Sequence, residues 1–242
     1  MAFVGNNQLF PSSFAQYQEF LNENTVVTGT AEAAMVTRVG ERLAEAAEKW
    51  LTSEGNAHYL DDYAWEYKLV ADNTVNAWCM PGGKIVVYTG ILPVTQTEEG
   101  LAVVLGHEIS HALLNHGQQR MSAGLLQQLG ALGLQVGLGV AGVSENTQSL
   151  AMAAYGIGTE LGGTLPFSRS HESEAEHYGL LLMSIAGYNP EAAVPFWERM
   201  SAMGSSGPEF LSTHPANSTR IRQLAGWTPE AKQKAAEFGV NF

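Results

Sequence analysis

Apolar residues recur at helical spacing near the start of the chain. Between Thr30 and Ser53 they fall mostly three or four positions apart, at Ala34, Val36, Val39, Leu43, Ala46 and Trp50. This is the spacing of one face of an α-helix, so the pattern predicts a long helix that begins at Thr30. Residues 11–13 predict the start of a shorter helix that runs to about Asn22. We expect these N-terminal helices, within residues 10–53, to be scaffold.

The pattern changes to that of β-strands between residues 65 and 88. Trp65, Tyr67 and Leu69 alternate with polar residues, and a second apolar run covers Ile85–Tyr88. Each run predicts a strand, and turn-forming residues at 72–73 and 81–83 lie between them. We therefore expect a small antiparallel sheet, with an edge near residues 84–88 that is open to a further strand.

Helical spacing returns after residue 95. Thr95 and Glu98 have the spacing of a capping box, and Gly117 is a suitable end for the helix that follows. The expected fold class is α+β: a mainly helical domain with the small antiparallel sheet beside the helix at 98–117.

Several shorter helices are expected in the C-terminal part of the chain. One runs from Ser168 to about Ala186, and the next follows Asn189, a suitable cap before a proline. After a loop at 204–208, a short helix is expected to carry Arg220, and a last helix opens at 228–230.

The segment 124–143 has no charged residue over 20 positions, which is long enough to span a bilayer. It also contains six glycines and three glutamines. Glycine lowers helix stability, and the glutamine amides would need partners in lipid. We therefore expect a soluble helical hairpin, lying over the active site or against a membrane surface, rather than a transmembrane helix.

Composition sets broad limits on domain organisation and partners. The chain has 242 residues, of which 45% are hydrophobic and 15% charged. A sizeable core is expected, and no linker or repeat divides the chain, so we expect a single domain over 1–242 with a catalytic core at about 60–225. The net charge of −12 argues against nonspecific nucleic-acid binding, which requires positive charge.

The single cysteine, Cys79, excludes an intrachain disulfide and a cysteine-rich zinc site. We expect it to be a buried, small apolar residue. The first residues lack the basic and apolar regions of a signal peptide. The expectation is either a cytosolic protein or one whose targeting segment is not part of this sequence.

The strongest chemical signal is an H-E-x-x-H motif at His107, Glu108 and His111. Since each helical residue advances by about 100°, the two histidines lie about 40° apart on one helix face, one turn above the other. Two imidazoles in this arrangement can hold one zinc ion, and Glu108 can take a proton from the attacking water. The alternative is two surface histidines on an ordinary helix.

A catalytic zinc usually has three protein ligands, so a third must come from another segment. Glu172 is the best candidate, at the start of the helix near residue 168, with Glu176 one turn below it. We expect Glu172 to bind the metal and Glu176 to accept the free ring N–H of a ligand histidine. The alternative is an acidic first turn, which the helix dipole favours.

These motifs resemble the HtpX / CaaX-prenyl-protease family of zinc metallopeptidases, and within it the soluble bacterial branch that includes BepA and LoiP. The resemblance covers roughly residues 30–225. The matching residues are Asn76-Ala77, Pro81-Gly82-Gly83, Thr89-Gly90, His107 to His111, Ser168-Arg169, Glu172 to Glu176, and Ser212 to Arg220.

The resemblance implies a thermolysin-like (gluzincin) core that holds one Zn²⁺ per chain, with Glu108 as the general base. It also implies that His214 and Arg220 face the zinc, where they stabilise the oxyanion of the reaction. In some relatives the corresponding histidine instead fills the open zinc position, which would make His214 a latency switch. The family usually has aspartate where this chain has Glu176, so the expected role of Glu176 is displaced or shared with Glu174.

The other four histidines, His58, His116, His171 and His177, lack a ligand partner at helical spacing, and we place them outside the site. His116 lies five residues after His111, which is off the zinc face of a continuous helix. Asn115 shares the face of His111 and is expected to line the cleft.

The expected function is zinc-dependent hydrolysis of polypeptides. The resemblance implies that these are misfolded or envelope proteins, and that the protein is a periplasmic or membrane-associated lipoprotein. One alternative is a chaperone or assembly adaptor with a silent peptidase site. A second alternative is a closed, structural metal site, against which the intact Glu108 argues.

Overall fold

The computed structural model describes residues 6–120, 167–203, 209–215 and 219–242. The expectations for the first residues, for the segment 124–143 and for the loop at 204–208 lie outside these ranges. Within them, every helix is either too short or too polar to span a bilayer.

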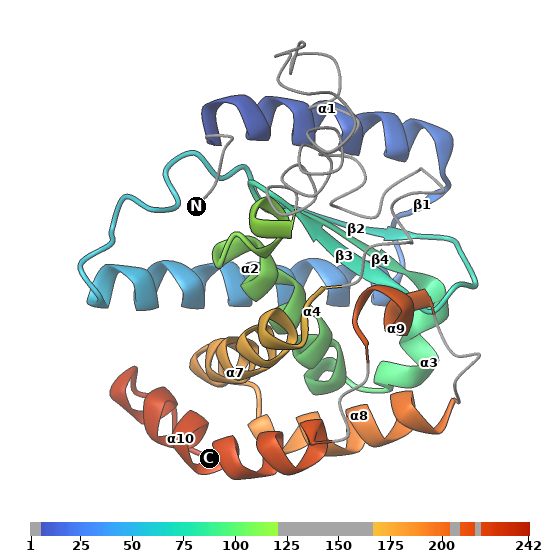
Figure 1. Cartoon of the computed structure of the whole chain (residues 1–242). Helices are drawn as coiled ribbons and strands as arrows, with labels where there is room; N and C mark the ends of the chain where they lie inside the picture. Colours follow the sequence, from blue (N-terminus) through green and yellow to red (C-terminus); the bar gives the residue numbers. More distant parts are fainter. Residues whose placement is uncertain (1–5, 121–166, 204–208, 216–218) are drawn as a thin grey trace, which may run out of the picture.

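The described elements are mainly helices, with four short strands near the N-terminal part (Figure 1). The strands are β1 (Val26–Val27), β2 (Glu66–Val70), β3 (Ala77–Met80) and β4 (Lys84–Tyr88). The α-helices are α1 (Asn6–Glu23), α2 (Ala31–Ser53), α3 (Leu92–Thr95), α4 (Glu98–Leu113), α7 (Arg169–Ile185), α8 (Ala193–Ala202), α9 (Glu209–Thr213) and α10 (Arg220–Glu237). Two 3₁₀-helices, η1 (Thr89–Ile91) and η2 (Pro190–Ala192), connect elements.

The α+β class is confirmed, but the sheet is mixed rather than antiparallel. Its strand order is β1-β2-β4-β3. β1 pairs with β2 and β3 with β4 in antiparallel fashion, whereas β2 and β4 are parallel. The chain forms a hairpin from β3 to β4 and inserts β4 beside β2. The strand at Lys84–Tyr88 is therefore central, and the expectation of an open edge there is wrong; β3 is the edge strand on this side.

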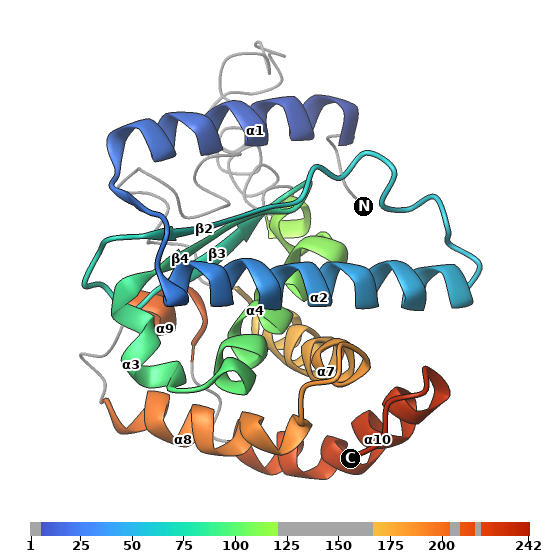
Figure 2. The same ribbon diagram turned by 180° about the vertical axis from the view of Figure 1, so that it is seen from behind.

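Alternate residues of the sheet face two different layers of helices. Leu69, Ile85 and Val87 belong to the main core, which includes α2 and α4. Val70, Trp78 and Val86 belong to a smaller cluster with Tyr17 of α1, on the opposite face. In Figure 2 the sheet accordingly lies between α1 and α2. Since β4 is covered on both faces, its sequence is apolar at successive positions.

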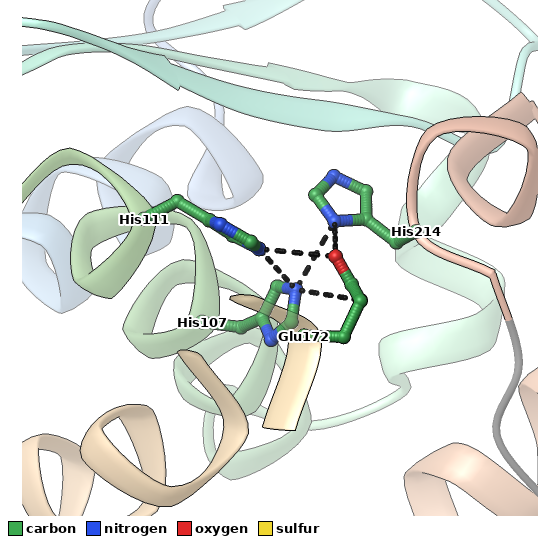
Figure 3. Close-up of side chains that lie close together, drawn as sticks. All are labelled: His107, His111, Glu172 and His214. Carbon is green, nitrogen blue, oxygen red and sulfur yellow. Dashed lines mark hydrogen bonds and ion pairs between the residues drawn. The ribbon is translucent and has the colours of Figure 1, made fainter. Parts of the chain in front are cut away.

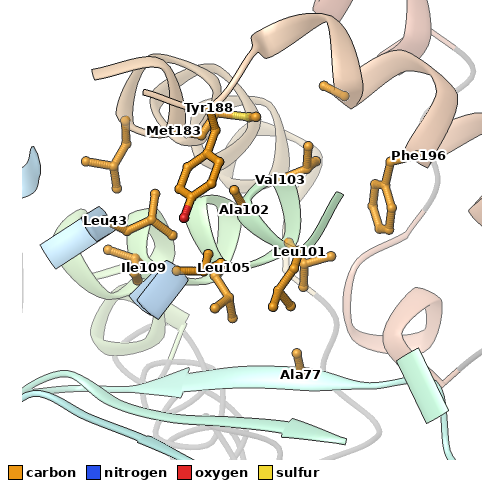
Figure 4. Close-up of a cluster of buried hydrophobic side chains, with 14 of the residues drawn as sticks. Leu43, Ala77, Leu101, Ala102, Val103, Leu105, Ile109, Met183, Tyr188 and Phe196 are labelled. Carbon is orange, nitrogen blue, oxygen red and sulfur yellow. The ribbon is translucent and has the colours of Figure 1, made fainter. Parts of the chain in front are cut away.

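The main core surrounds α4, which is buried along most of its length. Leu101, Leu105 and Ile109 of α4 pack with Leu43 of α2 and Met183 of α7 (Figure 4). Val36, Val39, Leu43 and Ala46 of the predicted stripe of α2 are buried, whereas Trp50 is half-buried and Ala34 is exposed. Thr30 caps this helix by accepting a hydrogen bond from the amide of Ala33. Burial of α4 among these elements fixes the helix that carries the H-E-x-x-H motif.

The ends of α4 differ from the expectation. Its N-cap is Thr97, whose hydroxyl accepts a hydrogen bond from the amide of Gly100, so the proposed capping box from Thr95 to Glu98 is wrong. Glu98 instead pairs with Arg38 of α2. At the other end the helix stops at Leu113 rather than at Gly117, because the backbone of Asn115 turns to a φ of +56°.

The C-terminal helices follow the expected order with one correction. α7 ends near Ala186, and Asn189 caps η2 as expected. α10 is one helix, although the sequence suggested a short helix and a separate last one. Pro229 lies inside α10, where it removes one backbone donor. The hydroxyl of Thr228 bonds the carbonyl of Leu224 in the same turn, and the helix continues.

α4 and α7 approach each other through two glycines. A Cβ at Gly106 of α4 would lie 2.8 Å from the carbonyl oxygen of Gly179, and a Cβ at Gly179 would lie 2.8 Å from the amide nitrogen of His107. Backbone atoms form both contacts, so no side chain can move to make room. These glycines set the distance between the helix of the motif and the helix that carries Glu172.

Gly179→Ala should therefore destabilise the metal-free protein by about 1–3 kcal/mol, the usual cost of overpacking. Gly226→Ala in α10 is the matched control, because a Cβ there meets nothing within 4 Å. Alanine is the better helix former, so this control should gain about 0.5–1 kcal/mol. Urea unfolding measures both, and equal effects of the two substitutions would contradict the role of the close approach.

Candidate metal centre

The two motif histidines lie one above the other on the inner face of α4, as expected. Nε2 of His107 and Nε2 of His111 are 3.0 Å apart. Their side chains are almost fully buried. Figure 3 shows the two rings turned toward a common point.

Glu172 reaches the same point from α7. The hydroxyl of Ser168 caps this helix by accepting a hydrogen bond from the amide of His171, and Glu172 follows in the first turn. Its Oε1 lies 3.3 Å from Nε2 of His111, and its Oε2 lies 3.5 Å from Nε2 of His107. The structure thus brings together the three residues that the sequence selected as metal ligands.

His214 adds a fourth donor to this group. Its Nδ1 lies 3.2 Å from Nε2 of His107 and 3.0 Å from Oε1 of Glu172. Its Nε2 lies 3.3 Å from Oε1 of Glu108. One ligand atom from each of His107, His111, Glu172 and His214 lies within 4.8 Å of the others. His214 therefore stands among the ligand atoms and also contacts the expected base.

Burial and mutual charge leave the donors in states that suit a metal. Burial lowers the pKa of His111 to about 4 and lowers the pKa of His107 as well, so both rings are neutral at pH 7. Burial opposes ionisation of Glu172, but His214 and His107 outweigh this effect and lower its pKa. Neutral imidazoles and an ionised carboxylate are the protein ligands of catalytic zinc, so this donor set fits that ion.

Glu108 has a different environment from Glu172. Burial raises the pKa of its carboxyl to about 7, although His214 and a hydrogen bond from the backbone of Cys79 act in the opposite direction. A carboxyl with a pKa near the working pH can both accept and return a proton. Two neighbouring carboxylates thus have separate properties: Glu172 stays ionised, and Glu108 can exchange a proton.

Arg220 faces the site from the start of α10, as the resemblance implied. Its guanidinium donates to Oε2 of Glu172 at 3.0 Å and also forms an ion pair with Glu176. It lies over the ring of Trp197, 3.9 Å from the centroid. Glu176 was expected to accept the ring N–H of a ligand histidine, but its partner is Arg220. Nδ1 of His107 has no hydrogen-bond partner among the residues that the structure describes.

His116 lies beside the site, although the sequence analysis placed it outside. Its Nδ1 is 2.9 Å from Nδ1 of His111, and its side chain is buried. The expectation assumed that the helix continued to Gly117, whereas the turn at Asn115 brings His116 back toward His111. An asparagine followed by a histidine and a glycine after an apolar helix was the available signal, because asparagine tolerates positive φ.

The remaining histidines lie away from the four donors. His58 is exposed and bonds Asp61, and His177 bonds Glu230 on the surface of α7 and α10. His171 stacks on His116, with 4.4 Å between ring centroids, and its Nε2 bonds Oε1 of Gln119. Glu174 was expected to share the role of Glu176 beside a ligand histidine. Its carboxylate instead bonds His116.

A pocket opens from the site toward the edge strand β3. Asn76, Trp78 and Cys79 line one side, and Glu108 and His111 line another. Asn115, Arg120, Phe167, Glu209 and Thr213 also line it, so the expectation for Asn115 is confirmed. Cys79 is buried as expected.

Comparison with known proteins identifies relatives of this arrangement. The mitochondrial metalloendopeptidase OMA1 of Schizosaccharomyces pombe is 39% identical over 179 residues, covering 72% of this chain and 50% of that protein. The OMA1 metalloendopeptidase of Homo sapiens is 33% identical over 175 residues, covering 69% and 33%. The beta-barrel assembly-enhancing protease of Escherichia coli is 30% identical over 190 residues, covering 74% and 37%.

These relatives correct part of the expectation. The narrower assignment to a soluble bacterial branch is not supported, because the two mitochondrial relatives are more similar to this chain than the bacterial one is. A periplasmic lipoprotein gains no support for the same reason. The chain spans half the length, or less, of these relatives.

The family model described as peptidase family M48 matches residues 31–228. This range contains α4 with its two histidines, α7 with Glu172, and the start of α10 with Arg220. The chain belongs to peptidase family M48.

Proposed function

We propose that this chain is a zinc-dependent endopeptidase in which His107, His111 and Glu172 hold the metal and Glu108 is the general base. The observation that carries the proposal is the convergence of these three buried ligand atoms beside a second carboxyl whose pKa is about 7. Mitochondrial and bacterial relatives whose names describe metalloendopeptidase or protease activity support it.

Glu108 and Arg220 have separate roles in the proposed reaction. Zinc, when bound, polarises the scissile carbonyl and makes water a better nucleophile. Glu108 takes the proton of the attacking water and passes it to the leaving amine. Arg220 holds the carboxylate of Glu172 in place through the hydrogen bond to Oε2.

The substrate is proposed to be a polypeptide that adds to the edge strand β3. β3 lines the same pocket as Glu108 and His111. A peptide that pairs with Ala77–Met80 therefore runs past the proposed base, with backbone hydrogen bonds that are independent of side-chain identity. Misfolded proteins, which expose extended segments, are the substrate class that this mode of binding suits.

A latent resting state is the second part of the proposal. Nδ1 of His214 lies as close to Oε1 of Glu172 and Nε2 of His107 as two ligand atoms of one zinc ion lie to each other. With His214 in this position the donor set has four members, which is the number in a closed zinc site. Displacement of His214 would free a position for water, so the residue is proposed to act as a switch rather than only as an oxyanion donor. A silent site in a chaperone or adaptor remains the competing function.

The proposed ligand set determines the metal affinity expected of the chain. The wild-type chain should bind one zinc per chain, and Glu172→Gln should weaken zinc binding by more than about 100-fold, because loss of an outer partner alone costs about 10–100-fold. Glu191→Gln, at an exposed carboxylate paired with Lys232, is the control and should have no effect. Chelator competition measures the affinities, and retention of wild-type affinity by Glu172→Gln would remove Glu172 from the ligand set.

The proposed general base can be removed without removing a metal ligand. Glu108→Gln should retain zinc but lose cleavage of an unfolded protein by at least about 10²-fold, the usual contribution of a general base. The chelator-treated wild type provides the reference for no activity. Undiminished cleavage by Glu108→Gln at full zinc loading would refute the assignment of the base.

Substitution of His214 separates its two proposed roles. At saturating zinc, His214→Ala should cleave unfolded protein faster than the wild type, because the fourth donor is removed. His58→Ala, at an exposed histidine far from the donors, is the control. A fall of about 10²-fold or more would instead assign His214 to stabilisation of the oxyanion. No cleavage by either protein would favour the adaptor function.

A further inference from the structure

A second buried histidine and a carboxylate stand behind the ligand His111. Nδ1 of His116 is 2.9 Å from Nδ1 of His111, on the side of the ring opposite the donor group. Nε2 of His116 is 3.1 Å from Oε2 of Glu174. His116 has no exposed surface, whereas the side chain of Glu174 is 55% exposed. The two contacts form a continuous line from the surface of α7 to the metal centre.

The backbone after α4 places His116 in this line. The amide of Leu114 bonds the carbonyl of Ser110, and the amide of Asn115 bonds the carbonyl of Ala112, so the last turn closes normally. Asn115 then adopts a φ of +56°, which ends the helix and reverses the chain direction. A new helical segment begins at His116 and runs through residue 120. His116 is therefore held at a helix start rather than in a free loop.

Hydrogen-bond chemistry fixes the direction of both bonds. An ionised carboxylate such as Glu174 only accepts, so Nε2 of His116 must carry the proton. In a neutral imidazole the other nitrogen is then an acceptor, and Nδ1 of His111 must donate to it. This leaves Nε2 of His111 with a free lone pair, 3.0 Å from Nε2 of His107 and 3.3 Å from Oε1 of Glu172.

We propose that Glu174 and His116 are positioning residues that together hold His111 in the tautomer and ring orientation required of a metal ligand. Ligand histidines commonly donate their second N–H directly to a carboxylate or carbonyl. Here a whole imidazole lies between the ligand and the carboxylate. The inference rests on the proposed zinc site and gives these two residues a part in it.

Two further observations support a specific role. His171 stacks on His116 with an interplanar angle of 16°, which holds the plane of the inserted ring. The other ligand, His107, has no partner at its Nδ1 among the described residues. Of the two motif histidines, His111 is thus the one whose tautomer is fixed by a neighbouring side chain. The line of contacts from Glu174 through His116 to His111, called the relay below, links α7 to the end of α4.

The test uses paired substitutions. His116→Phe keeps a ring of similar size but removes both hydrogen bonds, and should weaken zinc binding by about 10–100-fold. Glu174→Gln removes the charge and should cause a smaller loss. His177→Phe and Glu230→Gln are matched controls, because that pair has the same chemistry at 2.9 Å and Glu230 is 52% exposed, but it lies away from the donors. The controls should retain wild-type zinc affinity.

The double variant His116→Phe/Glu174→Gln should bind zinc as weakly as His116→Phe alone, because Glu174 acts only through His116. In the zinc-loaded wild type, ¹⁵N NMR should show a protonated Nδ1 on His111. Additive losses, or affinities of both single variants equal to those of the controls, would overturn the relay. If His116→Phe does not fold, Glu174→Gln at the surface decides. A wild type that binds no zinc would instead refute the proposed function.

Discussion

The buried carboxylate of Glu172 is the charge on which the arrangement of the site depends. Its side chain is 2% exposed. Removal of a carboxylate from water costs several kcal/mol unless other groups compensate. Around Glu172 this compensation comes from His214, whose Nδ1 lies 3.0 Å from Oε1, and from Arg220, which donates to Oε2. Nε2 of His107 and Nε2 of His111 lie within 3.5 Å of the same carboxylate, and together these atoms form a concentrated set of ligands for a divalent cation.

This concentration is only possible because two helices distant in sequence lie very close together. Gly106 of α4 and Gly179 of α7 let backbone meet backbone, and of the helices that the structure describes, α7 packs most extensively on α4. The edge strand β3 covers the other side of the motif and contributes a backbone hydrogen bond to Glu108. The fold and the site therefore depend on the same distance, the one between α4 and α7. Both helices lie within the residues that match the family model.

The features that could be predicted from sequence are those that depend on local periodicity. The stripe of α2, the placement of His107 and His111 on one face, and a helix starting at Ser168 with Glu172 in its first turn all follow from helical geometry.

The mixed sheet was missed because strand order depends on which strands meet in three dimensions, and alternation alone does not show it. α10 was divided at Pro229 because a proline usually begins or ends a helix, whereas here packing maintains the helix through it. His116 was placed outside the site because its position was derived from a continuous helix, whereas the positive φ of Asn115 ends the helix before it.

The central claim is that one zinc ion lies between the side chains of α4 and α7. The most direct measurement is an anomalous difference map from zinc-loaded crystals, with data collected on both sides of the zinc absorption edge. The account predicts one peak per chain at about 2.0–2.2 Å from Nε2 of His107, Nε2 of His111 and a carboxylate oxygen of Glu172. A peak elsewhere, or a zinc held by the histidines with Glu172 turned away, would contradict it.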